Sequence, residues 1–297
     1  MIRVVLQGRT GNNFFQYAAA RWLAERHGAE VVLDGSWLRT QNWAQAQSMK
    51  CLALKMRLCR WPLWIGPVLR VAAGKHPSEF VTKSVYCEST SDHAFDPAFT
   101  TLPDNTLLIG YFQSPRFFSS LRDSLQNEIN YRALPVGAET AETIRGMAGE
   151  NSVSVHVRRG DYLRYHNFAV CTPSYYETAI QRMKERLDSP TFWIFSDDIP
   201  WCRSHFRGPE FRFVEPKESA EIPLNDMRLM SLASHHIISN SSYSWWAAWL
   251  HWTPEKLVMV PDRWLLTTPR IPVHEKIENG WEIIDTGHHQ AAETQPS

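Results

Sequence analysis

The chain has 297 residues, 43% of them hydrophobic and 21% charged, which is typical of a globular protein with a substantial core. Lys and Arg (31) balance Asp and Glu (31), so the composition indicates no nucleic-acid partner, and any anion site must be local. Five Cys without close pairs indicate neither a disulfide framework nor a zinc site. We expect a cytoplasmic protein, because the sequence shows neither a signal peptide nor a run of about 18 apolar residues that could span a membrane.

The start of the sequence shows the β–loop–α–β pattern that opens a parallel sheet covered by helices. Residues 2–7 (IRVVLQ) and 29–34 (AEVVLD) are predicted to be buried strands. Between them, residues 8–13 (GRTGNN) predict a turn, in which Asn12 or Asn13 caps the helix that follows. The turn lacks the G-x-G-x-x-G motif of dinucleotide-binding loops, so by itself it is a weak indication of a ligand.

Residues 48–78 differ from the rest because they carry six Lys and Arg and no Asp or Glu, among many apolar residues. A basic apolar segment can lie on an anionic membrane surface. It can also be a helical hairpin with a solvated basic face, and this is the simpler interpretation.

Strands and helices alternate along the rest of the chain. Residues 105–113 (NTLLIGYFQ) predict a strand, a helix follows to about Asn130, and residues 132–139 have the composition of a linker. Beyond the linker, predicted strands at 152–158, 191–196, 210–214, 235–239 and 256–261 alternate with predicted helices at 173–187, 199–206, 223–234 and 243–251. This alternation predicts a doubly wound sheet, which binds ligands at the carboxyl ends of its strands.

We therefore expect two α/β domains and a tail. The N-terminal domain spans 1–135 and includes the basic segment 48–78, and the C-terminal Rossmann-like domain spans 136–285. The polar tail, 286–297, is expected to be disordered.

The first strand of the C-terminal domain ends in a cluster of charge: His156, Arg158, Arg159, Gly160 and Asp161 fall within six residues. The planar guanidinium of Arg matches the oxygens of a phosphate, and the Asp can orient an Arg or accept a proton. One Arg with one Asp would indicate a structural ion pair. The whole cluster predicts an anion-binding site.

Polar residues also follow the next strands. Asp197 and Asp198 could bind ribose hydroxyls or a metal, and we expect one of them to cap the following helix. Asp226 falls in the first turn of a predicted helix. Ser241 and Ser242 begin the helix WWAAWL, where free N–H groups and the helix dipole attract phosphate, although capping alone explains a Ser there.

Four of these segments resemble, in order, motifs of the bacterial α-1,2-fucosyltransferases of glycosyltransferase family 11. They are GRTGNNFFQYAAA (8–20), HVRRGDY (156–162), FSDDIPWC (195–202) and SNSSYSWWAAWL (239–250). The similarity extends from Gly8 to near Val260, with one departure: Asn13 stands where the family usually has Gln.

The resemblance implies a GT-B fold, in which two Rossmann-like domains face a cleft. It places the N-terminal domain (1–135) on the acceptor side and makes the C-terminal domain (136–285) the donor-binding domain. It implies an inverting transfer of L-fucose from GDP-β-L-fucose to the 2-hydroxyl of a terminal galactose, on an oligosaccharide or a lipid-linked O-antigen repeat. No essential metal and no further cofactor are implied. The partners are then GDP-fucose and a galactoside glycan, and the basic segment allows a peripheral contact with the inner face of the cytoplasmic membrane.

The resemblance also assigns roles to the residues. In the related α-1,6- and protein O-fucosyltransferases, the first Arg of the shared H-x-R core contacts the diphosphate, a role that falls here to Arg158, supported by His156 and Arg159. The remaining donor contacts are Gly11 and Asn12 from the first domain, Asp226 for guanine or ribose, Ser241 and Ser242 for the phosphates, and Asp197.

The chemistry of the transfer fits these assignments. Charge develops on GDP as it leaves, and a fixed cation stabilises the transition state more than the ground state. Without a divalent ion, Arg158 and the helix start near Ser241 must supply that charge. An inverting displacement also needs a base near the acceptor hydroxyl, for which Asp161 is our candidate and His166 and Glu25 are alternatives.

Three other functions stay open at this point. One is a fucosyltransferase with another linkage, such as α-1,6. Another is a sugar-binding protein without catalysis, suggested by thirteen Trp, whose flat apolar faces suit sugar rings. The third is a regulator that binds GDP without turnover.

Overall fold

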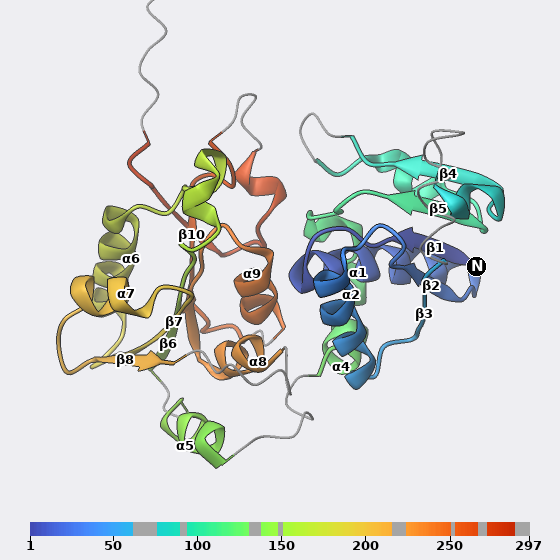
Figure 1. Cartoon of the computed structure of the whole chain (residues 1–297). Coiled ribbons are helices and arrows are strands. Elements are labelled where there is room, and N and C mark those ends of the chain that lie inside the picture. The colour runs from blue at the N-terminus through green and yellow to red at the C-terminus, as the bar shows by residue number, and fades with distance from the viewer. Residues whose placement is uncertain are drawn as a thin grey trace, which may run out of the picture.

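The structure is a computed structural model that describes residues 1–61, 76–89, 94–130, 138–147, 151–215, 224–250, 253–266 and 272–288. It contains two sheets of parallel strands, one in each half of the chain, with helices packed against them (Figure 1). The two α/β halves lie side by side, with helix α1 of the first half next to helix α9 of the second. This is the GT-B architecture that the sequence predicts.

The N-terminal sheet has the strand order β3-β2-β1-β5-β4, and every pair is parallel. Its strands are β1 (Ile2–Val5), β2 (Val31–Asp34), β3 (Met56–Cys59), β4 (Ser84–Cys87) and β5 (Thr106–Ile109). Its helices are α1 (Thr10–His27), α2 (Thr40–Gln47) and α4 (Arg122–Glu128). The central strands β1 and β2 are buried along their whole length, as expected for a parallel sheet covered on both faces.

The C-terminal sheet has the order β11-β10-β9-β6-β7-β8. Its strands are β6 (Ser152–Val157), β7 (Thr191–Ser196), β8 (Phe211–Val214), β9 (His235–Ile237), β10 (Val258–Pro261) and β11 (Glu282–Ile284). Read from β8, the strands follow the order 3-2-1-4-5-6 of dinucleotide-binding folds.

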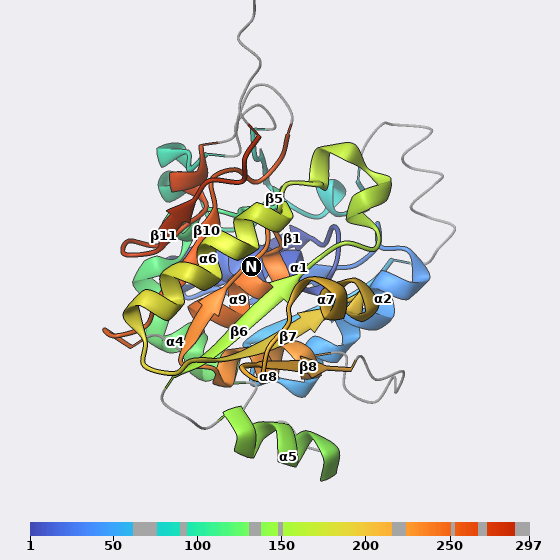
Figure 2. The same cartoon turned by 90° about the vertical axis from the view of Figure 1, so that its left-hand side faces the viewer.

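Helices cover both faces of this sheet, which confirms that it is doubly wound. Its helices are α6 (Pro173–Arg186), α7 (Ile199–His205), α8 (Asn225–Leu232) and α9 (Ser242–Trp249). Figure 2 shows α6 and α7 in front of the sheet and α9 behind it. A further helix, α5 (Ala138–Met147), precedes β6.

The two halves share one apolar core, which forms where α1 meets α9. The ring centroids of Phe15 and Trp245 lie 4.5 Å apart, and Phe118 stacks on Trp246 at 5.5 Å. Trp245, Trp246 and Trp249 are fully buried. These Trp side chains therefore join the halves instead of presenting faces to a sugar.

A second contact between the halves comes from the end of the chain. Glu275 accepts hydrogen bonds from Arg116 at 3.0 Å and from the backbone N–H of Phe95 at 3.2 Å. Glu278 pairs with Arg122 at 2.9 Å and accepts from the indole N–H of Trp249 at 2.6 Å. The segment after β10 thus returns to bind the N-terminal half.

Two of the local predictions in the N-terminal half are wrong. Helix α1 begins at Thr10, and Asn13 lies inside it and donates a hydrogen bond to the Gln7 carbonyl instead of capping. The helical-hairpin interpretation of 48–78 fails at β3, an edge strand paired with β2, while residues 62–75 lie outside the described residues. No helix in the described ranges has the length and hydropathy needed to cross a membrane.

The expected boundaries fall close to gaps in the described residues. Of the predicted linker, 132–137 lie outside the described residues, and α5 already begins at Ala138. Thr286, where the tail was expected to begin, is buried and donates a hydrogen bond to Asp262 at 2.6 Å, so the folded chain continues past it. Residues 289–297 lie outside the described residues.

Candidate active site

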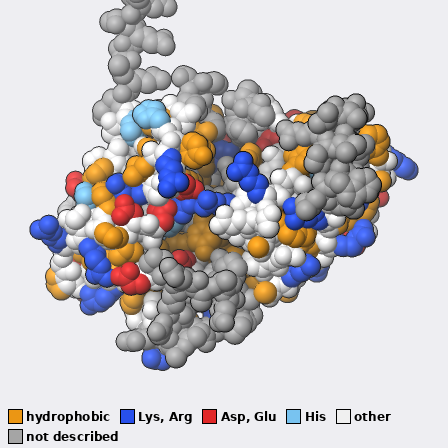
Figure 3. Space-filling view, viewed as in Figure 1, with side chains coloured by type: hydrophobic (Ala, Val, Ile, Leu, Met, Phe, Trp, Pro, Cys, Tyr) orange, Lys and Arg blue, Asp and Glu red, His pale blue; other side chains and the backbone are white. Residues whose placement is uncertain are grey.

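A cavity of about 540 Å³ lies between the two halves, a size that suits a small organic ligand. Figure 3 shows the hollow near the centre of the molecule, with basic and acidic side chains at its rim. Its lining includes the segments that follow β1, β5, β6 and β9. In each sheet, these neighbouring strands mark the point where the strand order reverses, which is where doubly wound sheets bind ligands.

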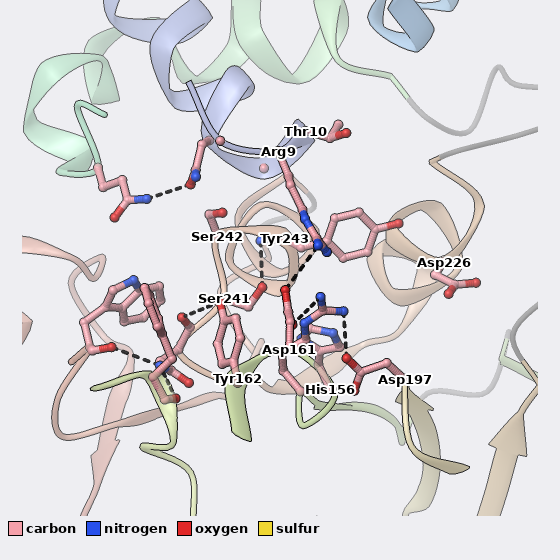
Figure 4. A pocket seen from close by; sticks show the side chains of 18 of the residues that line it. Arg9, Thr10, His156, Asp161, Tyr162, Asp197, Asp226, Ser241, Ser242 and Tyr243 are labelled. Carbon is pink, nitrogen blue, oxygen red and sulfur yellow. Dashed lines mark hydrogen bonds and ion pairs between the residues drawn. The ribbon is translucent and has the colours of Figure 1, made fainter. Parts of the chain in front are cut away.

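Arg158 lies on the cavity wall just after β6 and is held by two carboxylates, Asp161 and Asp197. Figure 4 labels both carboxylates. Its Nη2 lies 2.6 Å from Asp161 Oδ1, and its Nη1 lies 2.9 Å from Asp197 Oδ2. The guanidinium carbon also lies 5.6 Å from the ring centroid of Tyr162. With 22% of its side chain exposed, Arg158 is fixed in position and still accessible from the cavity.

The charges continue across the cavity to the other half of the molecule. Asp161 Oδ2 lies 3.2 Å from Nη2 of Arg9, which precedes α1. Arg9, Asp161, Arg158 and Asp197 therefore form a chain of alternating charge (Figure 4). Because each oxygen of Asp161 faces a guanidinium, this carboxylate is not a free base in this state.

Arg159 does not line the cavity, where its predicted contact with the donor would have to form. Its guanidinium lies 4.0 Å from the ring centroid of Trp201, and its Nε lies 3.1 Å from Asp198. Asp198 also accepts from the Trp201 N–H and caps α7, as expected for one of the two adjacent carboxylates. Neighbouring side chains of extended backbone point to opposite sides, which turns Arg159 away from Arg158.

His156 lines the cavity, but it carries no charge there. It is 7% exposed, and its Nδ1 lies 2.9 Å from the hydroxyl of Ser239. Burial lowers the pKa of His156 to about 3, and the nearby Arg158 adds to the effect. His156 is therefore neutral near pH 7 and can offer a diphosphate a hydrogen bond but no positive charge.

The first residues of α9 form the part of the wall next to Arg158. The hydroxyl of Ser241 accepts from the Tyr243 N–H at 3.3 Å, so the capping role is confirmed, and Ser241 and Ser242 both line the cavity (Figure 4). A Cβ atom on Gly11 would lie 2.6 Å from the Ser242 hydroxyl. Gly11 therefore lets the start of α1 approach α9, and it also lines the cavity, where its predicted contact with the donor stays a prediction.

Asn12 and Asp226 line the cavity from opposite halves. Asn12 accepts a hydrogen bond from Gln113 at 2.8 Å, which connects the segments after β1 and β5. Asp226, at the start of α8, has a pKa raised by burial. Within the described part of the chain it has no hydrogen bond or ion pair, so its carboxylate is open to a ligand that donates N–H or O–H groups.

The two alternative bases do not line the cavity. His166 and Glu25 are exposed and absent from the cavity lining, and Glu25 is paired with Arg21 on α1. Asp197 and Asp198 have different partners, so these adjacent carboxylates do not converge on one point. Among the residues that the structure describes, no group of three His, Cys, Asp or Glu is arranged to hold a metal ion.

Sequence reasoning missed the side chains that the N-terminal half contributes to the cavity. Tyr111 and Gln113 were placed inside a strand, but β5 ends at Ile109, and both belong to the segment that follows it. Gln45 of α2 lines the same side. The only available signal was the polar sequence after an apolar run, which did not show where the strand stops.

Comparisons with known proteins show the family of this chain. Residues 80–264, more than half of the chain, match the model of Glycosyl transferase family 11. The chain belongs to this family. The family expected from the motifs is thereby confirmed, and the protein is a glycosyltransferase. Three of the four motifs, at 156–162, 195–202 and 239–250, lie inside the matched range, whereas the motif at 8–20 lies outside it.

This family-11 chain is similar in sequence to three glycosyltransferases of known name. It is 29% identical over 283 residues to an α-1,2-colitosyltransferase of Escherichia coli, covering 87% of this chain and 90% of that one. It is 28% identical over 285 residues to the O-antigen biosynthesis glycosyltransferase WbnK of Escherichia coli, covering 87% and 93%. It is 24% identical over 261 residues to the galactoside 2-α-L-fucosyltransferase Sec1 of Mus musculus, covering 84% and 64%.

Proposed function

We propose that this glycosyltransferase moves L-fucose from GDP-β-L-fucose to the 2-hydroxyl of a terminal galactose, with inversion at the transferred carbon. One observation carries the proposal: the guanidinium of Arg158 lies on the cavity wall beside the start of α9, at the reversal point of the C-terminal sheet. A fixed guanidinium and a helix N-terminus are the two features that bind a diphosphate without a metal ion.

The transfer breaks the bond between the sugar carbon and the β-phosphate oxygen, so negative charge grows on the departing GDP. Arg158 would stabilise that charge because Asp161 and Asp197 hold its guanidinium in place before the reaction begins. Arg9 is the nearest cation on the opposite wall, at the other side of Asp161. A diphosphate that enters between Arg9 and Arg158 would compete with Asp161 for both of them.

The same competition would free an oxygen of Asp161, which could then act as the general base. Asp161 can accept a proton from the acceptor hydroxyl only when a guanidinium has left one of its oxygens. Asp161 forms ion pairs with Arg9 and with Arg158, and the pair with Arg9 is more exposed because 55% of the Arg9 side chain is accessible. We therefore expect the ion pair with Arg9 to break. Asp161 therefore stays our candidate base, in the donor-bound state.

Asp226 is our candidate for recognising the base of the nucleotide. Guanine carries two adjacent N–H donors on one edge, which a single carboxylate can accept together. Asp226 meets this requirement because it lines the cavity and is half-buried, and because no partner in the described ranges occupies its carboxylate. Adenine lacks this pair of donors.

The names of the relatives support glycosyl transfer to a galactoside, and they give two candidates for the transferred sugar. The mouse relative is named for L-fucosyl transfer to galactosides, whereas one Escherichia coli relative is named for α-1,2-colitosyl transfer. Colitosyl transfer to the same kind of acceptor is therefore the alternative function. The second Escherichia coli relative is named for O-antigen biosynthesis, which supports a lipid-linked repeat as the natural acceptor.

The test is a donor and acceptor panel. The purified protein is incubated with GDP-fucose, GDP-colitose or GDP-mannose and with a set of galactosides, and products are analysed by mass and linkage. We expect fucose on the 2-hydroxyl of galactose. Transfer from GDP-colitose alone would establish the alternative, and binding of GDP without transfer from any donor would contradict both.

A further inference from the structure

The segment that follows β5 has a backbone conformation that only surrounding contacts can hold. Phe112 has a φ of 55°, in the left-handed region that bulky side chains rarely adopt. Its ring is fully buried, and ring centroids of Phe117 and Phe99 lie 5.4 Å and 5.9 Å away. The residues on either side of Phe112, Tyr111 and Gln113, are the two that line the cavity.

Glu88, one residue beyond the end of β4, fixes this turn with both of its carboxylate oxygens. Oε2 accepts from the backbone N–H of Tyr111 at 2.7 Å, and Oε1 accepts from that of Phe112 at 3.0 Å. The residue is only 6% exposed. A Cβ atom on Gly110 would lie 2.5 Å from the Cβ of Glu88, so the Gly is required for the carboxylate to reach the turn.

The same turn is tied to helix α1 by two side-chain amides. The buried Gln16 donates from Nε2 to the Gly110 carbonyl at 2.9 Å, and Gln113 donates to Asn12 at 2.8 Å. The turn is thus held from β4 on one side and from α1 on the other. Of these restraints, Glu88 alone is a carboxylate that accepts two backbone N–H groups, and such charge-assisted bonds are the stronger kind.

The wall built by this turn differs in chemistry from the wall that carries Arg158. Gln45, Tyr111 and Gln113 are uncharged, and they offer amide donors and acceptors beside an aromatic ring. Amides suit the hydroxyl groups of a sugar, and an aromatic face suits its C–H surface. Among the described lining residues of the N-terminal half, Arg9 is the charged exception, and it already faces Asp161.

We propose that Glu88 is a positioning residue for the acceptor: by holding the turn, it keeps Tyr111 and Gln113 in the geometry that receives a neutral sugar ring. This inference rests on the proposed function, because it takes the ligand on this wall to be the acceptor glycan. Glu88 itself does not line the cavity and acts only through the turn.

The test compares wild type with Glu88→Gln. The amide keeps the shape of the side chain, but its NH₂ group would face a backbone N–H and lose that hydrogen bond. We expect the KM for the galactoside to rise about 10-fold or more, as the loss of one charge-assisted hydrogen bond allows. The KM for the donor and the Kd for GDP should change by less than about 2-fold, since the donor wall is untouched.

Three further variants separate positioning from general destabilisation. Glu128→Gln removes a carboxylate that is equally buried in the same half but binds Tyr17 and Arg21 away from the cavity. It should lower the Tm without raising the acceptor KM. Tyr111→Ala should raise the acceptor KM as Glu88→Gln does, and Tyr111→Phe should restore most of it because the ring remains.

Failure of the inference about Glu88 can be told apart from failure of the proposed function. With wild type active, an unchanged acceptor KM in Glu88→Gln, or a parallel rise in acceptor and donor KM, overturns the inference. If wild type transfers to no galactoside, the proposed function fails, and binding of lactose and N-acetyllactosamine to the GDP-saturated protein decides the inference. Weaker glycan binding by Glu88→Gln than by wild type supports it, while equal binding or no binding to either protein overturns it.

Discussion

The two walls of the cavity differ in charge and in how they are built. The C-terminal wall presents charged side chains placed directly at strand and helix ends, such as Arg158, Asp197 and Asp226. The N-terminal wall presents Gln45, Tyr111 and Gln113, two of which depend on a turn held by a remote carboxylate. The charged wall suits a nucleoside diphosphate, and the neutral wall suits a sugar.

Replacement of Arg158 is the strongest way to break the charged wall. Arg158→Ala should lower kcat by about 10²–10³, because the developing charge on GDP loses its fixed cation. Arg159→Ala is the matched control: this neighbouring Arg contacts Trp201 and Asp198 outside the cavity, and its loss should cost little activity. The measurement is the initial rate of transfer by each folded variant. A larger loss of activity in Arg159→Ala than in Arg158→Ala would mean that Arg159, and not Arg158, stabilises the leaving diphosphate.

A second prediction sharpens the claim that His156 is a neutral member of the charged wall. The pKa of His156 is about 3 in the folded protein, so the side chain stays unprotonated until the pH falls close to that value. In the unfolded chain it takes up a proton near the usual pKa of 6.5. Acid therefore favours the unfolded state, and stability present above pH 6.5 is lost as the pH falls. From pH 6.5 to 5 this one group should remove about 2 kcal/mol from the free energy of unfolding.

The measurement is urea unfolding of wild type and His156→Asn at several pH values. The variant should be less stable at pH 7 but should lose less on acidification, so that the two stabilities converge toward pH 5. Equal losses in both proteins would mean that His156 is protonated in the folded state, which would return a positive charge to this part of the wall.

Arg9 is the point where the two walls meet, and its replacement should have a smaller effect. Arg9→Ala removes a half-exposed cation that pairs with Asp161 across the cavity, so we expect GDP to bind about 10-fold more weakly. Arg26→Ala, at the other end of α1, is the control and should bind GDP as wild type does. Titration calorimetry measures both. Unchanged GDP affinity in Arg9→Ala would assign this residue to the contact between the halves alone.

The last prediction expects no effect at all. If the guanidinium groups and the start of α9 neutralise the diphosphate, transfer should be as fast in excess EDTA as without it. A strict requirement for Mn²⁺ would contradict this and would direct attention to Asp197 and Asp198.

The two halves also differ in how far the sequence predicts them. The predicted strand 191–196 is β7 to the residue, because TFWIFS is an apolar run with clear ends. Strands β3 and β4 were missed because they are short and lie at sheet edges, where half-exposed residues give no continuous apolar signal. Apart from α5 and β11, which were also missed, the C-terminal half was predicted nearly element by element. The N-terminal half was predicted only around β1, β2 and β5.

The site follows the same division. Charges directly after predicted strands could be found, as with Arg158 and Asp197, because the carboxyl ends of parallel strands share an edge. The direction of Arg159 follows from side-chain alternation, which the prediction of one anion site did not apply to this residue. The pairing of Arg9 with Asp161 and the neutrality of His156 depend on the docking of the halves and on burial, which no local pattern encodes.

A crystal structure of the protein with GDP would show directly whether Arg158 binds the diphosphate. We predict that the β-phosphate lies within hydrogen-bond distance of the Arg158 guanidinium, next to the first residues of α9. A diphosphate bound elsewhere, with Arg158 still paired only to Asp161 and Asp197, would contradict it.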